Sequence, residues 1–110
     1  MITEEEYQSQ LESAKDATEI LRIMNQYAWN IRRSYPLRSL EIGKAVQELA
    51  LESHDTHALA FGFENTGTAY YLLSMYQDSL NDLMVARGMF EDLELRVELS
   101  NIIRTIGNIF

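Results

Sequence analysis

The chain has 110 residues, and its 17 acidic and 9 basic side chains give a net charge of −8. This acidity argues against nucleic acid as a partner, because nucleic-acid affinity depends on Lys and Arg neutralising phosphates. The absence of cysteine excludes disulfides and thiolate chemistry. No apolar run approaches the roughly 18–20 residues that span a bilayer, and the acidic N-terminus lacks the apolar segment of a secretory signal. We therefore expect a cytoplasmic protein that binds neither nucleic acid nor membrane.

Apolar residues recur at spacings of three and four, which is the helical period. Near the N-terminus, Thr3 and Glu6 fit a capping box that begins a helix. A later helix is expected to end before Pro36, since the residue preceding a proline disfavours the α conformation. The sequence predicts six helices: Thr3–Ala14, Ala17–Ser34, Leu37–Ser53, Thr56–Ser74, Gln77–Leu93 and Arg96–Phe110. The apolar face of the second is expected to hold Ile20, Met24, Tyr27, Ala28 and Ile31.

Several residue types recur 40 positions apart. The pairs are Asn25 and Asn65, Ser34 and Ser74, Ser39 and Ser79, and Gly67 and Gly107. The spacing indicates a repeated pair of helices that occurs about two and a half times. Such a pair cannot bury its apolar face alone, so the units are expected to stack. Short connections make neighbouring helices antiparallel.

The second unit carries Phe63-x2-Thr66-Gly67-x2-Tyr70, followed by Ser79, Leu83 and Ala86. The third begins with Ile103-x2-Ile106-Gly107-x2-Phe110, and the first has Ala28, Ile31, Ser39 and Val46 at corresponding places. This pattern resembles the tetratricopeptide repeat, whose hallmark is W-x2-L-G-x2-Y followed by small and large apolar residues. Thr66 departs from the family pattern, which has an apolar residue there, and no proline closes either unit.

The resemblance implies an all-α fold, a right-handed superhelical stack of antiparallel helix pairs. Residues 1–110 then form one domain, with an N-terminal helix (1–15), repeat 1 (17–53), repeat 2 (56–93) and the first helix of an incomplete repeat 3 (96–110). The 40-residue period is longer than the usual ~34. In this it is similar to units that precede the output domains of bacterial signalling proteins. That similarity implies the N-terminal regulatory or scaffold part of a longer signalling protein.

The first helix of each unit has a polar face, which in the first two units also carries large aromatic residues. In the resembled family this face lines a concave groove that binds a peptide or a partner protein. The expected groove residues are Arg22, Asn25, Trp29, Arg32, Arg33, Phe61, Glu64, Thr68, Tyr71, Asn101, Arg104 and Asn108. Arginines and amides suit an acidic ligand or a free carboxylate, because a guanidinium can bind two oxygens at once.

Two other interpretations of these residues stay open. Trp29 and Phe61 would pack internally if the first helix covered them through Tyr7 and Leu11. The arginines would only stabilise a helix C-terminus, where cations are favoured.

The last helix predicts a different surface. Its apolar residues Leu99, Ile102, Ile103, Ile106 and Phe110 have no following helix to cover them. A stacked array normally ends in a helix with a polar outer face. We therefore expect the natural chain to continue, with self-association into a homodimer through this helix as the alternative function.

No catalytic pattern is present, so we expect neither an enzyme nor a bound cofactor or metal. Gly62, Gly67 and Gly88 lie within helical patterns rather than in a phosphate-binding loop. His54 and His57 flank Asp55, but such a group lacks the third or fourth ligand of a metal site. It is interpreted as a solvated turn and helix start.

Overall fold

The computed structural model describes all 110 residues and contains six α-helices and no strand. The helices are α1 (Glu4–Ser13), α2 (Ala17–Ile31), α3 (Pro36–Glu52), α4 (Thr56–Leu72), α5 (Tyr76–Asp92) and α6 (Arg96–Ile109). The all-α class is confirmed, and every expected helix is found with ends that differ by at most three residues. None of the six combines the length and apolar character that crossing a membrane requires.

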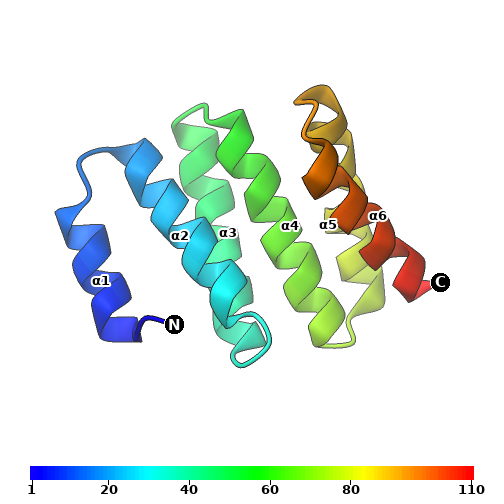
Figure 1. Ribbon diagram of the computed structural model, residues 1–110, viewed down its shortest axis with the longest axis horizontal. Coiled ribbons are helices and arrows are strands. Elements are labelled where there is room, and N and C mark those ends of the chain that lie inside the picture. The colour runs from blue at the N-terminus through cyan, green and yellow to red at the C-terminus, as the bar shows by residue number, and fades with distance from the viewer.

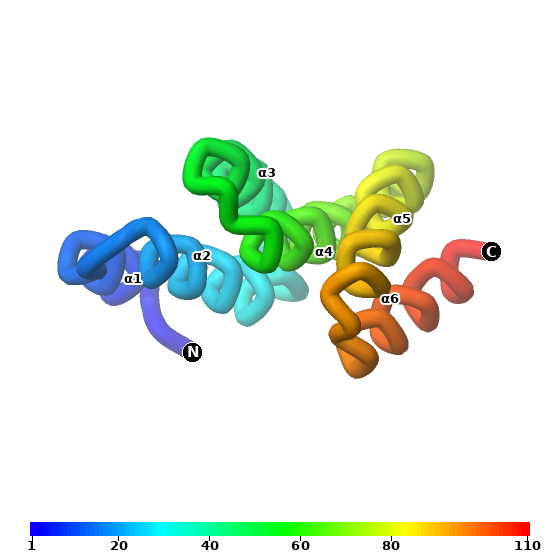
Figure 2. Tube along the Cα trace, turned by 90° about the horizontal axis from the view of Figure 1, so that it is seen from above, coloured from blue at the N-terminus to red at the C-terminus, as the bar shows by residue number.

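The helices form two layers. Consecutive helices run in opposite directions (Figure 1). Seen from above, α2, α4 and α6 lie on one side, whereas α3 and α5 lie on the other (Figure 2). The central helix α4 packs against α2, α3, α5 and α6. Its position explains why α4 has buried residues around most of its circumference, including several polar ones.

Three of the turns between helices share one conformation. His54, Ser74 and Glu94 all have positive φ. In the turn after α4, the amide of Met75 donates to the carbonyl of Tyr70 at 2.8 Å, and the amide of Ser74 donates to Tyr71 at 3.0 Å. This is the Schellman motif, which satisfies carbonyls left free at a helix end. Because it recurs at equal intervals, the helices after it begin at residues 56, 76 and 96.

The turn between α2 and α3 is built differently. It has no residue of positive φ, and α3 begins with Pro36, whose fixed φ suits the first helical position. The two helix pairs are nevertheless held alike, since the hydroxyl of Ser39 donates to the carbonyl of Ala28 and that of Ser79 to Gly67, both at 2.7 Å. These bonds make Ala28 the equivalent of Gly67. Ser39 lies 11 residues after Ala28, whereas Ser79 lies 12 residues after Gly67, so the first helix pair is one residue shorter between these positions.

The buried apolar residues form two clusters. The first joins α1 to α4 and contains Tyr7, Leu21, Ile23, Tyr27, Ala28, Ile31, Ile42, Val46, Ala50 and Ala58. The second joins α4, α5 and α6 and contains Ala60, Leu83, Ala86, Phe90, Ile102 and Ile106.

Polar hydrogen bonds cross α4 between α3 and α5. The hydroxyl of Thr66 accepts from the amide of Gln47 at 3.0 Å and donates to the carboxylate of Asp82 at 2.7 Å. Thr66, which departs from the family pattern, is fully buried. These bonds explain why a polar residue is tolerated there, since a buried hydroxyl needs partners.

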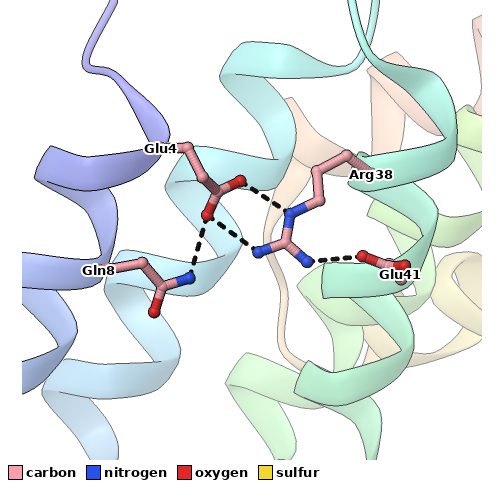
Figure 3. Close-up of polar contacts among 4 residues, drawn as sticks. All are labelled: Glu4, Gln8, Arg38 and Glu41. Atoms are coloured by element: carbon pink, nitrogen blue, oxygen red, sulfur yellow. Dashed lines mark hydrogen bonds and ion pairs between the residues drawn. The ribbon is translucent and has the colours of Figure 1, made fainter.

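Helix α1 is attached at the edge of the stack. The predicted capping box is present, with Thr3 and Glu6 exchanging hydrogen bonds. The guanidinium of Arg38 donates through Nε and Nη2 to the two oxygens of Glu4, at 2.9 and 3.0 Å (Figure 3). This hydrogen bond lowers the pKa of Glu4. The ring of Tyr7 stacks on Tyr27 with 4.1 Å between centroids, so α1 covers the Tyr27 side of α2.

Candidate ligand-binding groove

A groove of about 580 Å³ opens on the layer formed by α2, α4 and α6. Its size falls within the range of ligand-binding pockets. The lining residues are Thr18, Arg22, Asn25, Gln26, Trp29, Asp55, His57, Ala58, Phe61, Glu64, Asn65, Glu98 and Asn101. Helix α4 lies between α2 and α6 in this layer, so α2 and the first turns of α6 supply the two sides of the groove and α4 supplies the middle (Figures 1 and 2). The groove therefore exists only because three helices of one layer lie next to each other.

The structure brings some of the expected groove residues together and leaves others apart. Those that line the groove are Arg22, Asn25, Trp29, Phe61, Glu64 and Asn101. Those that do not are Arg32, Arg33, Thr68, Tyr71, Arg104 and Asn108. Tyr71 lies near Tyr76 of α5, with 5.9 Å between ring centroids. Arg33 is exposed in the turn after α2.

Arg32 and Arg104 make contacts within their own helical segments. The guanidinium of Arg32 donates to the carbonyl of Trp29 at 2.7 Å and lies 3.7 Å from the centre of the Trp29 ring. Arg104 donates to the side chain of Asn101 at 2.6 Å. Both arginines therefore contact groove residues without lining the groove themselves.

Sequence reasoning missed seven lining residues: Thr18, Gln26, Asp55, His57, Ala58, Asn65 and Glu98. Most belong to the starts of α2, α4 and α6. Asp55 caps α4 by accepting from the amide of Ala58 at 2.9 Å, in agreement with the interpretation as a helix start. The ring of His57 lies 5.0 Å from that of Phe61. The signal for His57, Ala58 and Glu98 was their place one turn before Phe61 and Asn101 on the same faces.

Two aromatic residues form the apolar part of the groove. Trp29 is partly buried and carries the Arg32 guanidinium on its ring. Phe61 rests edge-on against the buried ring of Phe90, with 5.0 Å between centroids. Helix α1 packs on Tyr27 instead, so it does not cover Trp29 and Phe61 as the internal-packing interpretation required. Both rings are held in place yet reachable from the groove.

Amide side chains connect α2 to α4 at the base of the groove. Asn25 donates to the carbonyl of Ala58 at 3.2 Å, and its side-chain oxygen accepts from Asn65 at 2.8 Å. Asn25 and Asn65, noted in the sequence for their equal spacing, thus contact each other. The side-chain oxygen of Asn65 is buried and receives no hydrogen bond.

Glu64 lies beside Asn65 and is only 7% exposed. The pKa of its carboxyl is raised to about 7, mainly by burial and also by the charge of Glu98, while Arg32 acts in the opposite direction. Because Ala28 is equivalent to Gly67, Glu64 occupies in α4 the place of Asn25 in α2. The side chain of Asn25 forms hydrogen bonds with α4, whereas the carboxyl of Glu64 is exposed to the negative charge of Glu98.

The charge of the lining differs from the basic groove that the arginines suggested. Arg22 is the only arginine or lysine in the lining, against the acidic residues Asp55, Glu64 and Glu98. The carboxylate of Asp55 is engaged as a helix cap. The groove thus presents more negative than positive charge, which favours a cationic over an acidic ligand.

The residues expected for self-association are divided between core and surface. Ile102 and Ile106 are 1% and 9% exposed and belong to the cluster around Phe90. Leu99 packs against the same cluster. Helix α5 packs against these side chains, and Ile102 and Ile106 are not available to a second chain, whereas Leu99 is only partly buried. Ile103 and Phe110, at 48% and 91%, remain on the surface.

No group of three or more His, Asp or Glu residues is arranged to hold a metal ion. No family model matches the chain, and neither a curated protein nor a solved structure matches it.

Proposed function

We propose that the protein is an interaction module whose groove binds a peptide segment of a partner protein. The observation that carries this proposal is the groove itself, which Trp29 and Phe61 both line while Trp29 contacts Arg32 and Phe61 contacts Phe90. Rigid aromatic anchors surrounded by polar groups are typical of protein interfaces, because the rings bury much area at little entropic cost.

The arrangement of helices supports a tetratricopeptide-like superhelical stack as part of the proposal. The two hydroxyl-to-carbonyl bonds of Ser39 and Ser79 tie each helix pair in the same way. The groove lies on the layer that contains the first helix of each pair, where the family binds peptides. By the same resemblance, we propose that the module regulates a bacterial signalling protein and carries no catalytic activity of its own.

Trp29 provides the experiment, because it is the only tryptophan of the chain. Peptides selected from a randomised display library on the whole chain are expected to change its fluorescence. With a fluorescein-labelled peptide, Phe61→Ala should weaken binding at least tenfold, since an aromatic anchor is removed. Tyr76→Ala, at an exposed position outside the groove, is the matched control and should leave binding unchanged. Equal binding by both variants would contradict the groove as the site.

A second candidate function is self-association through α6. Three large apolar side chains of this segment are exposed: Val97 at 71%, Ile103 and Phe110. Sedimentation velocity should then show a dimer that Ile103→Glu converts to a monomer. Ile106→Glu is unsuitable as a test, because a charge at this buried position would unfold α6. A wild-type chain that stays monomeric at 200 μM would exclude this candidate.

A further inference from the structure

We propose that the groove recognises a basic side chain, arginine or lysine, of the bound peptide, and that Glu64 and Glu98 accept its hydrogen bonds. This inference rests on the proposed function and names the chemistry that the groove selects. It reverses the acidic ligand that the arginines of the sequence suggested.

Glu64 has neither a hydrogen-bond partner nor an ion-pair partner inside the protein. The three ion pairs of the chain join Arg38 to Glu4, Arg38 to Glu41 and Arg87 to Glu91. Glu64 is more than nine-tenths buried and lines the groove. A buried carboxylate is costly unless it is paired. A bound cation would supply the missing counter-ion.

The side chain next to Glu64, that of Asn65, also has an acceptor without a donor. The buried oxygen of Asn65 also receives no hydrogen bond, although its amide nitrogen is engaged by Asn25. Turning the amide over would bring two oxygens together, so the orientation is fixed by this contact. Adjacent positions of α4 thus hold two acceptors that lack donors. A guanidinium or ammonium carries several donors and no acceptor.

The two arginines near the groove, Arg32 and Arg22, make their contacts with residues other than Glu64. Arg32 donates to the Trp29 carbonyl and stacks on its ring, and burial lowers its pKa. Arg22 points its guanidinium at Gln26, 3.5 Å away. Neither forms an ion pair with Glu64. The internal cations therefore leave the carboxylate open to one from outside.

The aromatic residues of the groove fit the same ligand. Trp29 and Phe61 line the groove together with Glu64. The face of an aromatic ring attracts a cation, and the attraction is stronger where water is excluded. The apolar stem of arginine or lysine can pack on a ring while its charged end reaches the carboxylates. One groove thus offers contacts for both parts of a basic side chain.

Binding should depend on pH, because a cation favours the charged form of Glu64. The charges that act on it are those of Glu98 from α6 and Arg32 at the end of α2. The other titratable groups of the groove lining are Arg22 from α2 and Asp55 and His57 from the start of α4. Because the pKa of Glu64 is about 7 in the free protein, the carboxyl is mostly protonated below pH 7. A cation that binds there must displace this proton. The preference for a cation should therefore grow between pH 6 and pH 8. A His57→Gln background removes the only histidine of the groove lining.

The experiment uses peptides selected from a randomised display library on the whole chain. Each is resynthesised with its basic residues replaced by citrulline or norleucine, which keep the length and remove the charge. Affinity is measured through Trp29 fluorescence at pH 6 and pH 8, in the His57→Gln background. The variants are Glu64→Gln and, as the matched control on the exposed face of α3, Glu48→Gln.

The selected peptides should contain a basic residue whose neutral replacement weakens binding at least tenfold at pH 8. In Glu64→Gln the same replacement should cost less than threefold at either pH, whereas Glu48→Gln should behave like the parent. Selected peptides that bind through Trp29 and Phe61 without an essential basic residue would overturn this inference and leave the proposed function standing. If no selected peptide binds Phe61→Ala more weakly than the parent, both this inference and the proposed function are overturned.

Discussion

The isolated carboxyl of Glu64 has a consequence for stability that can be measured without a ligand. Its pKa is raised to about 7 in the folded chain, whereas the unfolded chain has the ordinary value near 4.5. Between these two pH values the folded chain holds a proton that the unfolded chain has released. The contribution of Glu64 to the free energy of unfolding therefore falls as pH rises from 4.5 to 7. Above pH 7 the full penalty is present.

Glu64→Gln should remove this penalty. At pH 5 the gain should be only about 1 kcal/mol, because Glu64 is neutral in the folded chain while the unfolded chain has released most of its proton. At pH 8 the variant should be more stable by about 3 kcal/mol, the energy of the shift at 1.36 kcal/mol per pH unit. Urea denaturation at both pH values measures the difference, with Glu48→Gln as the exposed control. A gain that is the same at pH 5 and pH 8 would show that charge is not its cause.

Glycines provide a matched pair of substitutions at the residue scale. A Cβ on Gly67 would come within 2.7 Å of the Leu83 side chain and 3.2 Å of its backbone nitrogen. Gly67→Ala should therefore lower stability by about 1–3 kcal/mol, because α4 and α5 would have to separate. A Cβ on Gly88 would meet nothing within 4 Å. Gly88→Ala should raise stability by up to about 1 kcal/mol, since alanine is the better helix former. Thermal unfolding followed by circular dichroism would test both, and equal effects would contradict the close packing at Gly67.

The composition of the groove shows what a sequence does and does not predict about a site. Helical periodicity placed Trp29, Phe61 and Glu64 on faces that the structure brings together. It did not predict where long side chains end. Arg32 lies on the expected face but folds onto Trp29. Such contacts depend on flexible side chains choosing among local acceptors, which the spacing of residues does not encode.

At the scale of elements, the period of apolar residues predicted all six helices, and Thr3 and Glu6 predicted the capping box. The three Schellman turns were not recognised, because the usual signal is glycine and the residues there are His54, Ser74 and Glu94. On α2, Leu21 and Ile23 are buried although neither was expected in the core. Helix α2 packs against α1, α3 and α4, and one apolar face is an incomplete description of such a helix.

The Schellman turns lead to a prediction for a loop far from the groove. Ser74 has φ of 61°, a conformation that strains a side chain and suits glycine. Ser74→Gly should stabilise the protein by about 0.5–1 kcal/mol, part of the gain being offset by the greater freedom of glycine in the unfolded chain. Ser34→Gly, in the turn of α2 and α3 that lacks positive φ, should give no gain. Chemical denaturation measures the free energy of unfolding of both variants. An equal decrease in the two would contradict a strained conformation at Ser74.

At the scale of the whole molecule, stability is divided between two apolar clusters. Tyr7 of α1 belongs to the first cluster, and Phe90 of α5 belongs to the second. Thr66 and its partners Gln47 and Asp82 connect α3 to α5 across α4 by hydrogen bonds. Most of the helices pack mainly against their neighbours in sequence, so the ends of the chain can open without the rest.

Hydrogen exchange should reveal this division. Phe90→Leu disturbs the cluster that holds α6, and exchange should accelerate in α5 and α6 while α1 keeps the rate of the parent. Tyr7→Leu should have the opposite pattern, with faster exchange in α1, because the stacked ring on Tyr27 is lost. The amides of α4 should remain the slowest in both variants, since this helix contacts four others. A uniform acceleration along the chain in either variant would instead mean that both clusters unfold as one cooperative unit.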